Sequence, residues 1–189
     1  MAKIPLSGLE IIMSNDYEVI DNFLDPDEFD ELQSLILGID FPWYIATNVA
    51  SSKTNPYTLN DYNSKIENQL WNWYGVHIAY ITVPRSSHFD YLMSLFSQRL
   101  DMKTPIRIKV NFHPYTHEVK EHAQHQDYPY SHKGAVFSLN TCDGFTRMPN
   151  GDKIGSVANR IVLFDPSEYH NSSTTSNQKG RYNINFNYF

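Results

Sequence analysis

Cysteine is almost absent from this sequence. Cys142 is the only one, which excludes a disulfide within the chain and a cysteine-rich zinc site. Such a chain suits a reducing compartment, so we expect a cytoplasmic protein. The sequence also lacks an apolar run of signal-peptide length near its start and any run of 18 apolar residues, so we expect neither secretion nor a membrane span.

Positive charge is scarce as well. The 15 Lys and Arg are outnumbered by 21 Asp and Glu, giving a net charge of -6, and this argues against the broad basic surface that nucleic-acid binding requires. Hydrophobic residues at 41% and charged residues at 19% exclude a disordered, collagen-like or coiled-coil chain. The 189 residues contain no repeat or linker, so we predict a single domain spanning 1–189.

A first helix is predicted from Pro26 to about Leu37. Asp25 can serve as its N-cap, and Glu28 stands where it completes a capping box. Gly38 follows at the position of a left-handed C-cap.

A second helix is predicted to begin at Ser87, because Asp90 three residues later forms another capping-box pattern. Its apolar residues recur at helical spacing, namely Phe89, Leu92, Leu95, Phe96 and Leu100. Between the helices, residues 45–66 are rich in Asn, Ser and Thr and predict a long surface loop, and residues 71–83 predict a strand region.

In the rest of the chain, apolar and polar residues alternate with the two-residue period of β-strands. From position 106 onward, apolar Ile106, Ile108, Val110 and Phe112 alternate with polar Arg107, Lys109 and Asn111. Further short strands are predicted at 17–20, 135–139, 145–147, 159–164 and 181–189, with turns at Asp143-Gly144, Asn150-Gly151 and Asp165-Pro166. Helices followed by many short strands predict an α+β, mainly β fold, whose β part is a sandwich or barrel such as the jelly roll, or double-stranded β-helix.

Histidine is concentrated between positions 113 and 132, where five of the eight lie. A single histidine in such a turn-rich segment is by default a solvated polar residue. His125 differs because Asp127 would project from a strand to the same side, and His170 follows a later strand that a jelly roll folds back beside it. Two His and one carboxylate form the facial triad of non-haem Fe(II) oxygenases, whereas zinc more often takes a closed tetrahedral site.

Arg181 is the fourth candidate residue, at the start of the last predicted strand. The planar guanidinium group of arginine can donate two parallel hydrogen bonds to one carboxylate. If an acid co-substrate chelates the metal through one end, Arg181 can therefore hold the other. Each of these residues alone has a simpler explanation as a polar turn, a cap or a surface ion pair, and it is their order and spacing that favour a site. Cys142 is predicted not to be a ligand, because thiolate softness does not suit such a centre.

The sequence resembles the Fe(II)- and 2-oxoglutarate-dependent oxygenases, within them the prolyl 4-hydroxylase-like branch, over nearly the whole chain. The resemblance is carried by YEVIDNFLDPDEFDEL, by RIKVNFHPY leading to HQD, and by NRIVLFDPSEYHNSS followed by GRYNINFNYF. The short chain and its Asn-rich strands look like compact versions from phage and environmental sequences, which would place the protein in a host cytoplasm.

This resemblance implies a double-stranded β-helix with two supporting N-terminal helices. It further implies that His125, Asp127 and His170 hold Fe(II) and that Arg181 binds the distal carboxylate of 2-oxoglutarate. Dioxygen would be the second co-substrate and ascorbate an accessory reductant.

Other co-substrate contacts are expected at the same site. Tyr115 lies ten residues before His125, where the resembled branch often has a co-substrate tyrosine, and Asn111 could face the same cavity. The sequence departs from the branch at Ser138, where relatives carry a second tyrosine. The serine hydroxyl is too short to replace it, so Thr141 or a water is the expected donor.

The implied reaction is hydroxylation of a C–H bond with release of succinate and CO2. The expected substrate is a peptidyl proline or another protein side chain. The alternatives are a small-molecule hydroxylase acting on an amino acid or nucleotide, and a non-catalytic jelly-roll binding module in which the histidines are structural. The residues of the loop at 45–66 and of the segment 128–132 would determine whether the substrate is a peptide or a metabolite. The oligomeric state is not predicted.

Overall fold

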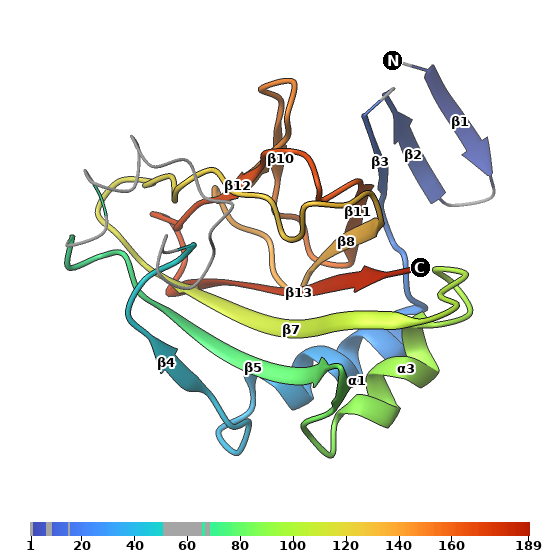
Figure 1. Ribbon diagram of the computed structural model, residues 1–189, viewed down its shortest axis with the longest axis horizontal. Coiled ribbons are helices and arrows are strands. Elements are labelled where there is room, and N and C mark those ends of the chain that lie inside the picture. Colours follow the sequence, from blue (N-terminus) through green and yellow to red (C-terminus); the bar gives the residue numbers. More distant parts are fainter. Residues whose placement is uncertain (1, 7–8, 15, 51–65, 67–68) are drawn as a thin grey trace.

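The computed structural model describes residues 2–6, 9–14, 16–50, 66 and 69–189, and it is mainly β (Figure 1). A ten-stranded antiparallel sheet forms its centre. In spatial order its path contains β1 (Ala2–Leu6), β2 (Leu9–Met13), β3 (Tyr17–Ile20), β11 (Arg160–Phe164), β8 (Lys133–Ser138), β13 (Gly180–Tyr188), β7 (Pro105–Pro114), β5 (Tyr74–Ile81) and β4 (Tyr44–Ala46), with β6 (Val83–Pro84) paired to β5.

A smaller antiparallel sheet contains β10 (Lys153–Gly155), β9 (Phe145–Arg147) and β12 (Asn171–Ser172). In Figure 1, β10 and β12 lie on one side of β7 and β13, and the helices α1 (Pro26–Leu37) and α3 (Phe89–Phe96) lie on the other. The predicted α+β jelly-roll class with two supporting helices is confirmed. In the described part of the chain the two sheets do not close into a barrel.

Helix α1 begins as the sequence predicted. Pro26 occupies the first turn, and the Glu28 carboxylate accepts a hydrogen bond of 3.2 Å from the backbone N–H of Asp25. The predicted left-handed cap is wrong, because Gly38 is extended, with φ -66° and ψ 155°. Glycine is needed here for space, since a Cβ on Gly38 would lie 2.9 Å from the carbonyl oxygen of Ser34.

Helix α3 begins later than predicted, with His88 rather than Ser87 as its N-cap residue. Ser86, the residue before Ser87, contacts the start of the helix. Its Oγ accepts a hydrogen bond of 3.0 Å from the backbone N–H of His88 and lies 2.7 Å from His77 Nε2. The chain there forms a turn, so the capping box expected at Ser87 does not start the helix. Leu100 follows the end of the helix and is still buried in the core.

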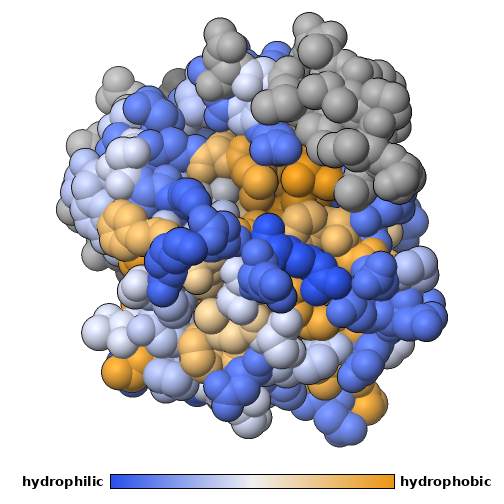
Figure 2. Space-filling view, turned by 90° about the vertical axis from the view of Figure 1, so that its right-hand side faces the viewer, coloured by the Kyte–Doolittle hydropathy of each residue, from blue (hydrophilic) through white to orange (hydrophobic). Residues whose placement is uncertain are grey.

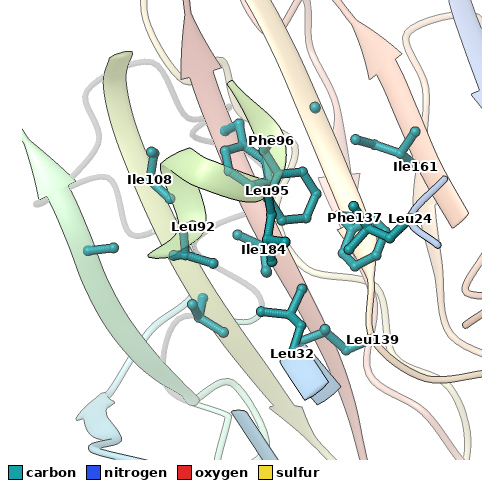
Figure 3. Packing of buried hydrophobic residues seen from close by; sticks show 14 of the residues in the cluster. Leu24, Leu32, Leu92, Leu95, Phe96, Ile108, Phe137, Leu139, Ile161 and Ile184 are labelled. Carbon is teal, nitrogen blue, oxygen red and sulfur yellow. The ribbon is translucent and has the colours of Figure 1, made fainter. Parts of the chain in front are cut away.

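The hydrophobic core lies between the helices and the larger sheet (Figure 3). Phe96 is at its centre, with its ring centroid 5.0 Å from that of Phe137 and 4.6 Å from that of Phe186. Leu32 from α1 and Ile184 from β13 are fully buried in the same cluster. Burial of this apolar face accounts for much of the stability of the fold.

Most predicted strands are present within one or two residues of their expected limits. The hairpin between β9 and β10 contains the predicted turn, and Gly151 adopts a φ of +91° that favours glycine. The loop predicted over 45–66 largely lies outside the described residues, and its first two residues belong to β4. The sequence did not predict β1, β2, β4, β10 or β12, and the last three are only two or three residues long.

The two faces of the central strands differ in chemistry. Ile108 and Val110 of β7 face the helices, whereas Arg107, Lys109 and Asn111 line a cavity on the opposite side. β13 has the same alternation, with Ile184 and Phe186 in the core and Arg181, Asn183 and Asn185 lining the cavity. The polar face of the alternating strands is therefore an interior one.

Ten large hydrophobic side chains are exposed among the described residues, with Ile39 and Leu70 the most exposed of them. Figure 2 shows one face with a central group of hydrophobic residues and hydrophilic residues around it. Such a mixture is ordinary for a protein surface, so the buried polar residues are more informative about function. Among the described residues, none of the helices is long and apolar enough to span a membrane.

Candidate functional site

Three predicted ligands meet at one point. One ligand atom from each of His125, Asp127 and His170 lies within 4.8 Å of the others, and the described residues contain no second group of this kind. The backbones of His125 and His170 are paired, with N–H to O distances of 2.9 and 3.0 Å. The backbone N–H of Asp127 donates to the carbonyl of Pro166 at 2.8 Å. These bonds bring together residues that are 45 positions apart in the sequence.

The two imidazoles are oriented for metal binding. His125 Nδ1 lies 3.2 Å from the Ala123 carbonyl oxygen and His170 Nδ1 lies 2.9 Å from that of Glu168. Because a carbonyl only accepts, each Nδ1 donates its proton and each Nε2 keeps a free lone pair. Burial lowers the pKa of His125 to about 3 and also lowers the pKa of His170, so both rings are neutral at physiological pH.

The Asp127 carboxylate is held on both oxygens. Asn187 Nδ2 donates to Oδ2 at 2.9 Å, and a guanidinium nitrogen of Arg107 lies 2.5 Å from Oδ1. Burial acts to raise the pKa of Asp127, but the charge of Arg107 outweighs it and holds that pKa well below its usual range. Arg107 also lies over the Tyr128 ring, 5.2 Å from its centroid. Asp127 is therefore a fixed, ionised carboxylate.

Arg181 is buried, with 1% of its surface exposed. Its Nη1 donates to the Phe145 carbonyl and its Nη2 to Thr146 Oγ1, both at 2.7 Å. Nε has no hydrogen-bond partner among the described residues, and none of their carboxylates pairs with this guanidinium. Burial lowers the pKa of Arg181 to about 10, which still leaves it charged at neutral pH. A buried cation without a counter-ion is costly, and this favours an anionic ligand.

One cavity of about 250 Å³ contains both the triad and Arg181. Its walls come mainly from the polar faces of β7 and β13, with Thr146 of β9 and Ser172 of β12 on the other side. The predicted Asn111 is in this wall, where its Nδ2 donates to Asn183 Oδ1 at 3.0 Å.

Two predicted co-substrate residues lie elsewhere, so both assignments are corrected. Tyr115 follows the end of β7, is 51% exposed and lines a separate surface hollow beside Lys179. Thr141 is exposed, and its Oγ1 accepts from the backbone N–H of Ala158 at 3.0 Å. Thr146 is the threonine that contacts Arg181. Spacing along the chain could not separate the two threonines, because the choice depends on how β9 packs across β13.

A buried histidine pair was also missed. The rings of His113 and His122 are 5.0 Å apart, and His113 is the cross-strand partner of Arg181. Nδ1 of His113 and Nε2 of His122 have no hydrogen-bond partner among the described residues. Burial, and then the charge of Arg181, lowers the pKa of His122 to about 3, so this ring is neutral. The signal for His113 was available, because it continues the alternation that places Arg107, Lys109 and Asn111 on one face.

Comparison with known proteins gives matches only by structure. No protein-family model matches the sequence, and no curated protein matches it. A prolyl hydroxylase from Trichoplax adhaerens, solved with a hypoxia inducible factor oxygen degradation domain peptide fragment, is 16% identical with a TM-score of 0.60, over 93% of this chain and 84% of that one.

Two further solved structures are similar over 92% of this chain. An oxidoreductase of the 2OG-Fe(II) oxygenase family from Burkholderia pseudomallei has 12% identity and a TM-score of 0.61, over 84% of its own chain. The viral collagen prolyl hydroxylase from Paramecium Bursaria Chlorella virus-1, in its 2OG complex, has 13% identity and a TM-score of 0.51, over 96% of its chain. At these identities the similarity establishes that the fold is shared.

Proposed function

We propose that this protein is an Fe(II)- and 2-oxoglutarate-dependent oxygenase that hydroxylates a C–H bond and releases succinate and CO2. The observation that carries the proposal is that one cavity holds two neutral imidazoles, a carboxylate and a buried arginine that pairs with no carboxylate of the described residues. The fold shared with solved oxygenases supports it.

The donor set fits divalent iron. Two His Nε2 atoms and one Asp oxygen would hold the ion, and such a triad leaves coordination positions open for other ligands. The groups behind the ligands are already in place, because carbonyl oxygens orient both imidazoles, and Asn187 with Arg107 orients Asp127.

The opposite end of the cavity fits a dicarboxylate. Arg181 would bind one carboxylate through Nε and its charge, with Thr146 and two peptide carbonyls fixing the guanidinium plane. The amides of Asn111 and Asn183 line the wall near this end. When bound together, iron, 2-oxoglutarate and dioxygen supply the oxidising chemistry, whereas the protein supplies position and exclusion of water.

Peptidyl proline is the first substrate candidate, because one structural neighbour was solved with a hypoxia inducible factor peptide fragment. A small molecule is the second candidate, favoured by the modest volume of the cavity and its polar, charged walls. Ascorbate would act as an accessory reductant. The competing class is a binding module without catalysis.

The test is succinate release from purified protein supplied with Fe(II), ascorbate and 2-oxoglutarate. We expect the wild type to release succinate, and His170→Ala to lose both this activity and metal binding because one of three ligands is gone. His117→Ala is the matched control, since that histidine is exposed, and it should behave as the wild type. If the wild type binds neither Fe(II) nor 2-oxoglutarate, the proposal is wrong and the protein is a non-catalytic binding module.

A further inference from the structure

The cavity carries more positive charge than the proposed co-substrate requires. Arg107, Lys109 and Arg181 line it, and Asp127 is the only carboxylate among its described lining residues. This excess is notable in a chain whose net charge is -6. Arg107 pairs with Asp127, and Arg181 is placed to bind a carboxylate of the co-substrate. Lys109 therefore needs another partner.

Among the described residues, no carboxylate forms an ion pair with Lys109. It lies in β7 between Arg107 and Asn111, and its cross-strand neighbours are Asn185 on β13 and Ile78 on β5. In the described part of the chain, none of the recorded ion pairs or hydrogen bonds engages its ammonium group. Burial, and then the charge of Arg107, lowers the pKa of Lys109 to about 7, and the attraction of Asp127, the carboxylate that Arg107 already pairs with, does not offset them.

A bound metal and co-substrate would not supply that anion. The iron would bring two positive charges and 2-oxoglutarate two negative ones, so cations would still outnumber anions around the cavity. A cation enclosed without a partner is unfavourable, and a second anionic molecule would relieve this.

We infer that the primary substrate is a small carboxylic acid whose carboxylate pairs with Lys109 while a C–H bond faces the triad. This inference rests on the proposed function and narrows its substrate class. A peptidyl proline fits less well, because its carboxyl group is part of an uncharged peptide bond and brings no negative charge to Lys109. On β7 and β13 the wall residues beside Lys109 are the amides of Asn111 and Asn185, and the apolar Ile78 of β5 completes its surroundings, so the carbon skeleton of a small acid and its carboxylate both find partners there.

The experiment measures binding of matched acids and amides to protein loaded with Mn(II) and 2-oxoglutarate, by calorimetry. The probes are acetate, butanoate and L-proline against acetamide, butanamide and L-prolinamide, with an end-blocked proline peptide as the competing substrate class. We expect at least one acid to bind at least tenfold more tightly than its amide. Succinate release with Fe(II) then shows whether the same acid stimulates turnover.

Lys109→Met keeps the length of the side chain and removes the charge, and Lys109→Arg retains the charge. We expect Lys109→Met to weaken acid binding at least tenfold with 2-oxoglutarate affinity within about twofold of wild type, and Lys109→Arg to restore part of the loss. Lys179→Met is the control, because Lys179 is exposed and outside this cavity.

Three results would overturn the inference. In the first, no acid binds more tightly than its amide to the wild type. In the second, the blocked peptide stimulates wild type and Lys109→Met equally. In the third, Lys109→Met weakens 2-oxoglutarate itself tenfold, which would place Lys109 in the co-substrate site. Failure of the proposed function has its own readout, because the wild type would then show no metal-dependent binding of 2-oxoglutarate. That result would overturn the proposed function and this inference together.

Discussion

At the scale of single residues, the candidate centre depends on the partners behind each ligand. His125 and His170 each use Nδ1 on a carbonyl two residues earlier, so their tautomers are set locally by the backbone. Asp127 depends instead on distant side chains, Asn187 and Arg107. Mutations of these partners should therefore separate effects on the metal from effects on the co-substrate.

Arg181→Ala is expected to weaken 2-oxoglutarate on the order of 10- to 100-fold and metal binding far less, because the arginine faces only the distal end of the cavity. The measurement is titration of 2-oxoglutarate and of Mn(II) by calorimetry. Arg181→Lys retains the charge and should fall between wild type and Arg181→Ala, which guards against a loss caused by misfolding. An equal loss of affinity for 2-oxoglutarate and for Mn(II) would show that Arg181 does not act on the co-substrate alone.

Asn187→Ala should lower metal affinity about 10- to 100-fold, because Asp127 would lose the amide that fixes its Oδ2. Titration with Mn(II) measures the change. Asn185→Ala is the matched control on the same strand face, since none of its recorded contacts reaches the triad. If the two variants bind metal alike, the hydrogen bond to Asp127 does not orient the ligand.

At the scale of elements, β7 and β13 each have two functions. Their apolar faces pack on the helices, and their polar faces line the cavity. The period of two that predicted the strands therefore also identified which residues share the site face, including Lys109. A substitution on the polar face should alter ligand binding more than stability, and one on the apolar face should do the reverse.

The segment before the triad is tied to the smaller sheet by Glu121. Arg147 contacts both carboxylate oxygens at 2.7 Å, and Lys153 and Asn171 lie at 3.1 and 3.3 Å. The hydrogen bond from Arg147 is the main cause that lowers the pKa of Glu121 to about 2. A pKa lower in the folded than in the unfolded state stabilises the fold above the unfolded pKa, and this contribution is lost as the pH falls towards about 2.

Glu121→Gln should therefore lower the free energy of unfolding by about 1–2 kcal/mol at pH 7, a figure reduced for partial exposure of the ion pair. The difference from wild type should shrink below pH 4.5 and vanish near pH 2. Denaturant unfolding across this range measures it. Glu118→Gln, at an exposed position, should change stability less, and a Glu121→Gln deficit that did not depend on pH would contradict the ionic origin.

At the scale of the whole molecule, the larger of two hydrophobic clusters shares its strands with the site. Helices α1 and α3 and the central strands share this cluster, and the site lies on the other side of those strands. The prediction that residues 1–189 form a single domain implies one cooperative unfolding transition. Metal binding should raise the temperature of that transition without splitting it.

Phe96→Ala should destabilise the protein by about 3–5 kcal/mol, because it empties the centre of the aromatic cluster with Phe137 and Phe186. Thermal or denaturant unfolding gives the change, and Leu37→Ala at a 44% exposed position should alter stability by about 0.5 kcal/mol or less. A small effect of Phe96→Ala would mean that the helices contribute little to the core.

The sequence by itself determined the fold class, most of the strands and the candidate triad. The strands, the first helix and the pair of His125 and Asp127 follow from local signals, whereas His170 was assigned from the expected return of a later jelly-roll strand. The pairing of Arg181 with Thr146 rather than Thr141, the position of Tyr115 outside the cavity and the support of Asp127 by Asn187 were decided only by tertiary structure. The physical reason is that these contacts join strands distant in the sequence, so the sheet order and register choose the partners.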